Sequence, residues 1–302
     1  MSKTRDFIDQ YASVRSPFII GERLNTQGSR QFKQIMLDAQ YDQILPIARR
    51  QIEQGARALD LCTAMSENAD EQTYMLRLVE AVTGRVDAAL CVDTTQPHVM
   101  EAALQVIQEP CILNSTHLEH GREKADRVFE LAKAHSASVI VLTIDEQGMA
   151  HTAGRKLEVA HKIHDIAVND HGLAPEDLIF DTLTFTLATG EPQYENSAVE
   201  TLTAIQQIKQ EMPGVLTSLG VSNVSYGFSP EARIVLNNIM LEQAVQHELD
   251  LCIFNPGHLL DFATIPADQR LLAENLIYNR SGNALRDIAA YFRKLRKDKA
   301  AA

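Results

Sequence analysis

The sequence contains few cysteines, and none of them has the spacing of a metal or redox motif. The four residues, Cys62, Cys91, Cys111 and Cys252, include no CxxC pair, and each lies in an apolar run. This pattern is typical of reduced core thiols and predicts a cytoplasmic protein without a disulfide framework or a zinc cluster. The ten histidines are scattered and form no HxH pair, so we expect no bound metal.

Long hydrophobic runs and clustered positive charge are also lacking. No stretch of eighteen apolar residues occurs, and the first residues, MSKTRDFIDQYASVRS, lack the apolar segment of a signal peptide. We therefore expect no membrane span. The formal net charge of -12 argues against a nucleic-acid partner. The one basic run, residues 293–299, is typical of the solvated last turn of a helix.

Apolar runs of strand length recur along the chain and alternate with segments of helical periodicity. We predict eight strands, at residues 18–24, 58–62, 89–94, 111–114, 138–145, 178–183, 215–221 and 251–255. Alternating strands and helices indicate a parallel sheet, and eight such units favour a closed (β/α)8 TIM barrel of the α/β class. GxGxxG and GxxxxGK[ST] fingerprints, which would mark an open nucleotide-binding sheet, are missing.

The organisation predicted from this pattern is one domain over residues 1–302. The barrel spans about residues 17–260, and two extra C-terminal helices follow at about 266–297. No linker rich in glycine, serine or proline interrupts the chain, so no second domain is expected.

Most of the predicted strands end on a carboxylate or a carboxamide. In a barrel these carboxyl ends converge on one mouth, where the active site lies. Each residue alone could cap the next helix, as Asp and Asn often do. As a set, however, Asp93, Asn114, Asp145 and Asn223 would be costly to bury without a ligand or each other. Their fixed planes suit a flat heterocycle with adjacent donors and acceptors, such as the amino-pyrimidinone edge of a pterin.

Several motifs carry a resemblance to a known family. FIIGERLN, VDTT, ILNST, VIVLTIDEQG, LIFDTLT, GVSNVSYG and CIFNP occur in this order between residues 18 and 256. Together they resemble the pterin-binding methyltransferase family. It comprises the folate domain of cobalamin-dependent methionine synthase and the free-standing methyltetrahydrofolate:corrinoid methyltransferases. The resemblance implies a dihydropteroate-synthase-like barrel and a methyltransferase that moves a methyl group between N5 of tetrahydrofolate and the cobalt of a corrinoid protein.

The family motifs also imply which residues form the site. Pterin contacts would fall on Asp93, Asn114, Asp145 and Asn223, with Asn223 meeting N5 and Asp145 extending the catalytic network. Lining positions with a weaker motif match are Glu22, Asn25, Asp181 and Asn255. Where relatives often have DIN or DVN, this chain reads DLC and ends on Cys62, which removes one expected hydrogen bond.

The resemblance further implies partners and leaves alternatives open. The chain has no DxHxxG corrinoid signature, so the corrinoid would arrive on a partner protein, and relatives suggest a homodimer. One alternative is a non-catalytic folate-binding subunit of a corrinoid methyltransferase complex. Another is a barrel enzyme that acts on a different heterocycle or sugar. A dihydropteroate-synthase-like activity is disfavoured because the final strand, CIFNP, lacks basic residues for a diphosphate.

Overall fold

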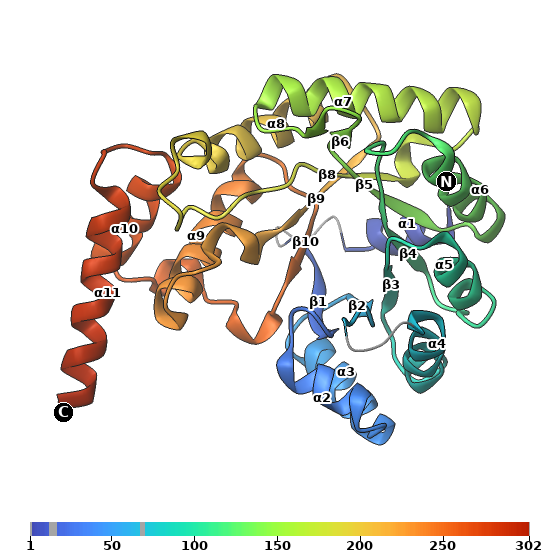
Figure 1. Cartoon of the computed structure of the whole chain (residues 1–302), viewed down its shortest axis with the longest axis horizontal. Helices are drawn as coiled ribbons and strands as arrows, with labels where there is room; N and C mark the ends of the chain where they lie inside the picture. Colours follow the sequence, from blue (N-terminus) through green and yellow to red (C-terminus); the bar gives the residue numbers. More distant parts are fainter. Residues whose placement is uncertain (1, 12–16, 67–69, 302) are drawn as a thin grey trace.

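The computed structural model describes residues 2–11, 17–66 and 70–301. In these ranges the chain forms a closed barrel of eight parallel strands (Figure 1). The order around the barrel is β1-β10-β9-β8-β5-β4-β3-β2. The strands are β1 (Phe18–Asn25), β2 (Ala58–Cys62), β3 (Ala89–Asp93), β4 (Cys111–Thr116), β5 (Ser138–Leu142), β8 (Leu178–Asp181), β9 (Leu216–Gly220) and β10 (Leu251–Phe254). The predicted TIM barrel is confirmed.

One predicted strand, residues 138–145, is interrupted in the structure. β5 ends at Leu142, which pairs with Asp181 of β8. The chain then forms β6 (Ile144–Asp145), which pairs antiparallel with β7 (Gly148–Met149) outside the barrel sheet. Gly148 has a φ of +94°, a backbone conformation that glycine adopts readily, and this permits the tight connection between β6 and β7. Asp145 therefore lies beyond the barrel strand that was expected to carry it.

Helices cover the outside of the barrel. They are α2 (Arg30–Leu37), α3 (Ile44–Glu53), α4 (Glu71–Val82), α5 (Pro97–Leu104), α6 (Glu123–His135), α7 (Ala153–Asp165), α8 (Ser197–Glu211) and α9 (Pro230–Gln246). Pro97 occupies the first turn of α5, where its missing N–H is not needed. The two predicted C-terminal helices are α10 (Ala267–Ile277) and α11 (Ala284–Ala301), which lie beside α9 at one flank of the barrel (Figure 1).

The hydrophobic core has an inner and an outer part. Inside the barrel, one cluster joins inward-facing residues of all eight strands, among them Ile20, Ala58, Cys91, Ile112 and Ile179. Outside it, the strands pack against the helices through two larger clusters. Since side chains alternate along a strand, the inward set continues two residues further towards the mouth. No helix in the described ranges is long and apolar enough to cross a bilayer.

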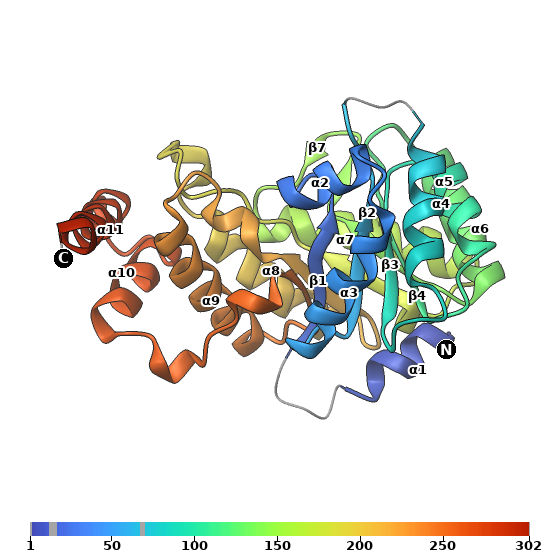
Figure 2. The ribbon, with the colours of Figure 1, turned by 90° about the horizontal axis from the view of Figure 1, so that it is seen from below.

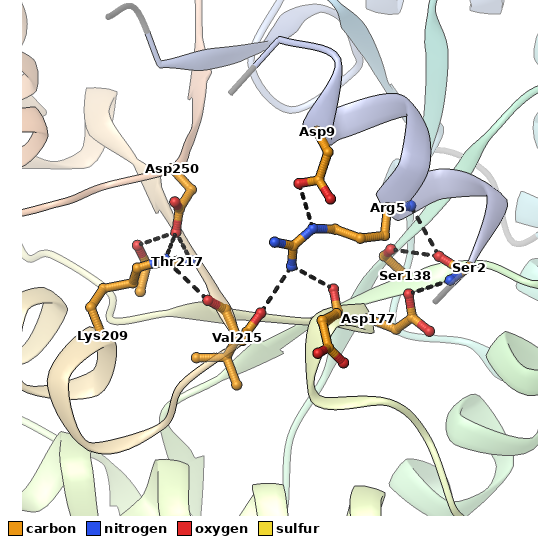
Figure 3. Close-up of polar contacts among 11 residues, drawn as sticks. Ser2, Arg5, Asp9, Ser138, Asp177, Lys209, Val215, Thr217 and Asp250 are labelled. Atoms are coloured by element: carbon orange, nitrogen blue, oxygen red, sulfur yellow. Dashed lines mark hydrogen bonds and ion pairs between the residues drawn. The ribbon is translucent and has the colours of Figure 1, made fainter. Parts of the chain in front are cut away.

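The opposite end of the barrel is closed by α1 (Lys3–Asp9) (Figure 2). Phe7 packs edge-on against Phe18 at a centroid distance of 6.2 Å, and Ile8 belongs to the inner cluster. Arg5 Nη1 donates to the backbone oxygens of Glu176 at 3.0 Å and Gly214 at 2.9 Å (Figure 3). The helix thus seals the apolar interior and leaves the mouth as its polar end.

Candidate functional site at the barrel mouth

A polar layer lies directly above the apolar interior, on the mouth side. Each of its members stands two residues beyond an inner-cluster residue of the same strand, so strand alternation turns it inward. The layer consists of Glu22, Asp60, Asp93, Asn114, Asp181 and Ser218. Four of the six carry carboxyl groups. The barrel therefore presents a concentrated set of hydrogen-bond acceptors to whatever enters its mouth.

Asn25 joins two of these carboxyl groups. Its Nδ2 donates to Asp60 Oδ2 at 2.8 Å and to Asp93 Oδ2 at 3.0 Å. The pairing of β1 with β2 shifts register between Gly21 and Leu24, as in a β-bulge. This shift allows both Glu22 and Asn25 to face the interior although they are three residues apart. The predicted lining residue Asn25 thus holds the second and third strands together at the mouth.

Burial shifts the acidity of the layer. Burial and the nearby charge of Asp93 raise the pKa of Asp60 well above its ordinary value. Burial likewise raises the pKa of Asp93 to about 6, against the bonds donated by the Cys62 thiol and Asn25. The pKa of Glu22 is also raised by burial, although Ser222 donates to its Oε2 at 3.3 Å. Ionising these groups is costly unless N–H donors reach them, which a pterin would supply.

Asp181 ends β8 and is only 5% exposed. Its Oδ1 accepts the Leu183 N–H at 2.7 Å. Burial raises the pKa of Asp181 to about 6, and the Leu183 N–H and the charge of Lys156 hold it from rising further. Asp181 therefore has the position and the environment expected of a ligand-binding carboxyl group.

Asp145 differs from the other predicted site residues. Its Oδ2 accepts from Arg155 Nη2 at 2.5 Å, and Lys162 Nζ lies 3.9 Å away. Burial raises the pKa of Asp145, but the bonds from Arg155 and the Gln147 N–H outweigh it, so the pKa lies below its ordinary value. Its carboxylate is thus engaged by cations of α7, and none of its hydrogen bonds reaches the polar layer.

Asn223 lies in the short 3-10 turn η5 (Val221–Ser225) that follows β9. Its flanking residue Val224 is fully buried, while Asn223 itself is exposed. A Cβ on Gly220 would lie 3.3 Å from Asn223 Nδ2, and the Gly220 Cβ position faces the interior because Leu216 does. The carboxamide therefore lies over the mouth. Within the described ranges it makes no hydrogen bond, unlike Asn25.

The remaining two predicted residues lie on opposite sides of the mouth. Asn114 of β4 pairs with Asp93 in the barrel sheet, and its carboxamide lies beside the Asp60 carboxyl group. Asn255 follows β10, and its Oδ1 accepts the Gly257 N–H at 3.1 Å as the cap of a 3-10 turn. It also lines a cavity of about 470 Å³ with Arg23.

The sequence analysis missed three features of the barrel mouth. Asp60 stands two residues after the inward-facing Ala58 of β2. The alternation of side chains along a strand could therefore have predicted that Asp60 faces the interior. Ser222, in the turn after β9, donates a hydrogen bond to Glu22 of β1 at the mouth. Lys156 is fully buried on α7 and contacts the end of β8, but a single lysine in a helical pattern gave no sign of this.

Cys62, which stands where the family resemblance implied an asparagine, also lies at the barrel mouth. Cys62 is 3% exposed, and its thiol hydrogen-bonds the Asp93 carboxyl group. Burial and the charges of Asp93 and Asp60 raise the pKa of this thiol. The thiol at this position is therefore engaged by Asp93 in the described structure. Within the described residues, no cluster of three or more His, Cys, Asp or Glu side chains could hold a metal ion.

Comparison of the sequence with known proteins identifies its family. Residues 21–255 match the family described as pterin binding enzyme. Methionine synthase of Mycobacterium tuberculosis is 35% identical over 276 residues, which is 89% of this chain and 23% of that protein. Methionine synthase of Mycobacterium leprae is 36% identical over the same shares. The chain thus spans about a quarter of the length of these relatives.

Solved structures support the fold. Dihydropteroate synthase of Yersinia pestis, with a pterine-sulfa conjugate, has a TM-score of 0.57 at 15% identity, covering 88% of this chain and 94% of that one. The Xanthomonas albilineans enzyme in complex with 7,8-dihydropteroate has a TM-score of 0.55 at 16% identity, covering 93% of each chain. At such identities the likeness concerns the barrel alone. With the family match across nearly the whole barrel, the resemblance inferred from the motifs is confirmed, and this chain belongs to the pterin binding enzyme family.

Proposed function

We propose that this chain is a methyltransferase that moves a methyl group between N5 of tetrahydrofolate and the cobalt of a corrinoid carried by a partner protein. One observation carries the proposal: the unpartnered Asn223 carboxamide lies over a layer of buried carboxyl groups at the barrel mouth. The similarity to two methionine synthases supports methyl transfer over other pterin chemistry.

The polar layer fits the pterin end of a folate. The amino-pyrimidinone edge presents several N–H donors, and Asp93, Asp181 and Asp60 offer carboxylate oxygens to accept them. Asn114 can donate and accept, and therefore suits the carbonyl and ring nitrogen of the same edge. Accepting N–H bonds stabilises the ionised carboxylates, whose pKa values burial raises in the free protein.

Asn223 would act at N5 of the folate. During methyl transfer the N5–methyl bond breaks as the cobalt–methyl bond forms, and N5 leaves easily only if it carries a proton. A carboxamide oxygen can accept a hydrogen bond from protonated N5, and the carboxamide nitrogen can donate to its lone pair. Because the Asn223 side chain makes no hydrogen bond in the described structure, its carboxamide is free to rotate between these two roles.

Asp145 has a different part in this proposal from the one expected of it. Its ion pair with Arg155 fixes the β6–β7 ribbon at the mouth, so it shapes the rim next to the site. Of the residues at the ends of β5 and β8, Asp181 of β8 is then the one that contacts the pterin. Replacing each residue separately with asparagine tests these assignments. Asp181→Asn should weaken folate binding more than Asp145→Asn does.

The role of Asn223 can be tested by replacing it with alanine. Since the side chain is exposed and unpartnered, Asn223→Ala should leave the fold and the tetrahydrofolate affinity nearly unchanged. Loss of an interaction made mainly in the transition state should lower the single-turnover rate by about 10²–10⁴-fold. Stopped-flow absorbance of the corrinoid measures the rate, and calorimetry measures the affinity. Tyr226→Phe, at a 71% exposed neighbour, serves as the control.

The same assay separates an enzyme from a non-catalytic folate-binding subunit. Both would bind tetrahydrofolate in a titration, but only the enzyme would exchange methyl groups with a reduced corrinoid protein or with free cobalamin. Wild-type transfer rates in Asn223→Ala would contradict the assignment of Asn223. A failure of tetrahydrofolate to bind at all would contradict the proposed function itself.

A further inference from the structure

Lys156 is a buried charged side chain with no contact to solvent. It lies in the first half of α7 and has 0% exposed area. Its Nζ donates to the backbone oxygen of Thr182 and, at 2.8 Å, to that of Leu183. Both acceptors directly follow Asp181, the carboxyl group at the end of β8. The ammonium group of a residue on an outer helix thus contacts the backbone of the loop that follows β8 at the mouth.

The Leu183 peptide group connects this lysine to Asp181. Leu183 N–H donates to Asp181 Oδ1 at 2.7 Å, while Leu183 O accepts from Lys156 and from Thr201 Oγ1 at 2.7 Å. Leu183 has a φ of +53°, a left-handed conformation that is unfavourable for a residue with a Cβ. The bonds to its oxygen stabilise that conformation, and with it the direction of the N–H that orients Asp181.

The charges around Lys156 also bear on Asp181. Burial lowers the pKa of Lys156 to about 8, whereas Asp181 and Glu200 of α8 favour its charged form. Phe185 covers the ammonium group at 5.8 Å from the ring centroid. On the other side, the charge of Lys156 counteracts the effect of burial on the pKa of Asp181. A cation in such a dry position acts more strongly on its neighbour than it would in water.

We propose that Lys156 is a positioning residue for pterin binding: through the Leu183 peptide group and its own charge, it orients the Asp181 carboxylate and keeps it ready to accept a pterin N–H. This inference rests on the proposed function, since it assigns Asp181 to the pterin. Lys156 would thus act on the polar layer indirectly, through the backbone that follows β8.

The inference predicts how folate affinity depends on pH. Affinity should fall as pH drops through about 6, where Asp181 gains a proton and becomes a weaker acceptor. Asp93 titrates in the same range, so the contribution of Asp181 is the part of this limb that the Lys156 variants move. It should also weaken as pH rises past about 8, where Lys156 loses its charge. In Lys156→Met, the acid midpoint of Asp181 should move up by about one pH unit, so the affinity should drop about twofold at pH 7 and about fivefold at pH 6, and the alkaline limb should vanish. Calorimetric titration with tetrahydrofolate between pH 5 and 9 measures all three.

Two further variants separate charge from geometry. Lys156→Gln can still donate to a carbonyl oxygen but is neutral, so it should shift the acid midpoint as Met does, and it serves if Met fails to fold. Thr201→Val removes one donor to Leu183 without changing charge, so it should weaken binding without moving the midpoint. Lys133→Met is the matched control, because Lys133 also donates to a backbone oxygen, that of His171 at 2.7 Å, but on the exposed side of α6.

A ligand-free measurement keeps the inference separate from the proposed function. The infrared band of protonated Asp181, assigned by its loss in Asp181→Asn, should titrate near pH 6 in wild type and higher in Lys156→Gln. Unchanged titration of this band in the Lys156 variants would overturn the inference even if folate binds normally. If the band shifts but wild type binds no tetrahydrofolate, the electrostatic coupling stands, and both the pterin role of Lys156 and the proposed function fail.

Discussion

The buried Asp181 carboxyl group should make the folded protein less stable at neutral pH than a neutral side chain would. Its pKa is raised from an ordinary 3.8 to about 6. The folded state therefore binds the proton more tightly than the unfolded chain, so stability falls as pH rises from about 4 to 6. A shift of about two units corresponds to about 3 kcal/mol of penalty, fully present above pH 6.

Asp181→Asn removes this ionisation while keeping an oxygen that can accept the Leu183 N–H. We expect the free energy of unfolding at pH 7 to rise by about 3 kcal/mol relative to wild type, with almost no gain at pH 4. Tetrahydrofolate affinity should fall at the same time, because an amide oxygen is a weaker acceptor than a carboxylate. The site would then trade stability for binding, as functional sites often do.

Urea denaturation of wild type and variant at pH 4, 5, 6 and 7 measures the effect, with calorimetry for the affinity. Asp165→Asn is the control, because the Asp165 side chain is 74% exposed on the same helix as Lys156. It should change stability by less than about 0.5 kcal/mol at every pH. A gain of equal size at pH 4 and pH 7 would refute the reasoning, because it could not come from ionisation. A loss at pH 7 would also refute it.

Two other substitutions probe the mouth and the opposite end of the barrel. Asn25→Ala removes the donor shared by Asp60 and Asp93, so the pKa of both carboxyl groups should rise. Tetrahydrofolate should then bind at least tenfold more weakly at pH 7, which calorimetry measures. An unchanged affinity would contradict the shared network. Arg5→Ala removes two bonds to backbone oxygens and one to Asp9, which should lower the free energy of unfolding by about 1–3 kcal/mol without affecting folate affinity. Thermal unfolding checks the second, and an undiminished melting temperature would show that α1 does not help to hold the barrel closed.

The barrel was predictable because its signal is repeated eight times. Each strand is a short apolar run bounded by turn residues, and in six of the eight strands the inward position changes from apolar to polar at the same depth, as from Ile20 to Glu22 and from Cys91 to Asp93. Local errors at strand ends do not alter such a pattern. The gathering of Asp93, Asn114 and Asp181 at one mouth follows directly from parallel strands, whose carboxyl ends share one edge.

The predictions that the structure modified depend on contacts between distant residues. The run 138–145 resembles one strand, yet β5 stops at Leu142 and residues 144–145 pair with residues 148–149 instead. Asp145 accepts the Gln147 N–H at 3.0 Å in this turn and forms an ion pair with Arg155. Similarly, Lys156 resembles a surface lysine until the loop after β8 is seen to cover it. The spacing of residues in the sequence predicts neither contact, because each contact depends on where a second element lies in the folded protein.

The central claim is that the mouth transfers a methyl group between folate and a corrinoid. The most direct measurement mixes the protein with methyltetrahydrofolate and free cobalamin reduced to Co(I), and follows the corrinoid spectrum in a stopped-flow instrument. The account predicts that the Co(I) absorbance decays to that of methylcobalamin at a rate that depends on protein concentration and saturates with methyltetrahydrofolate. An unchanged Co(I) spectrum, at folate concentrations shown by titration to fill the site, would contradict it.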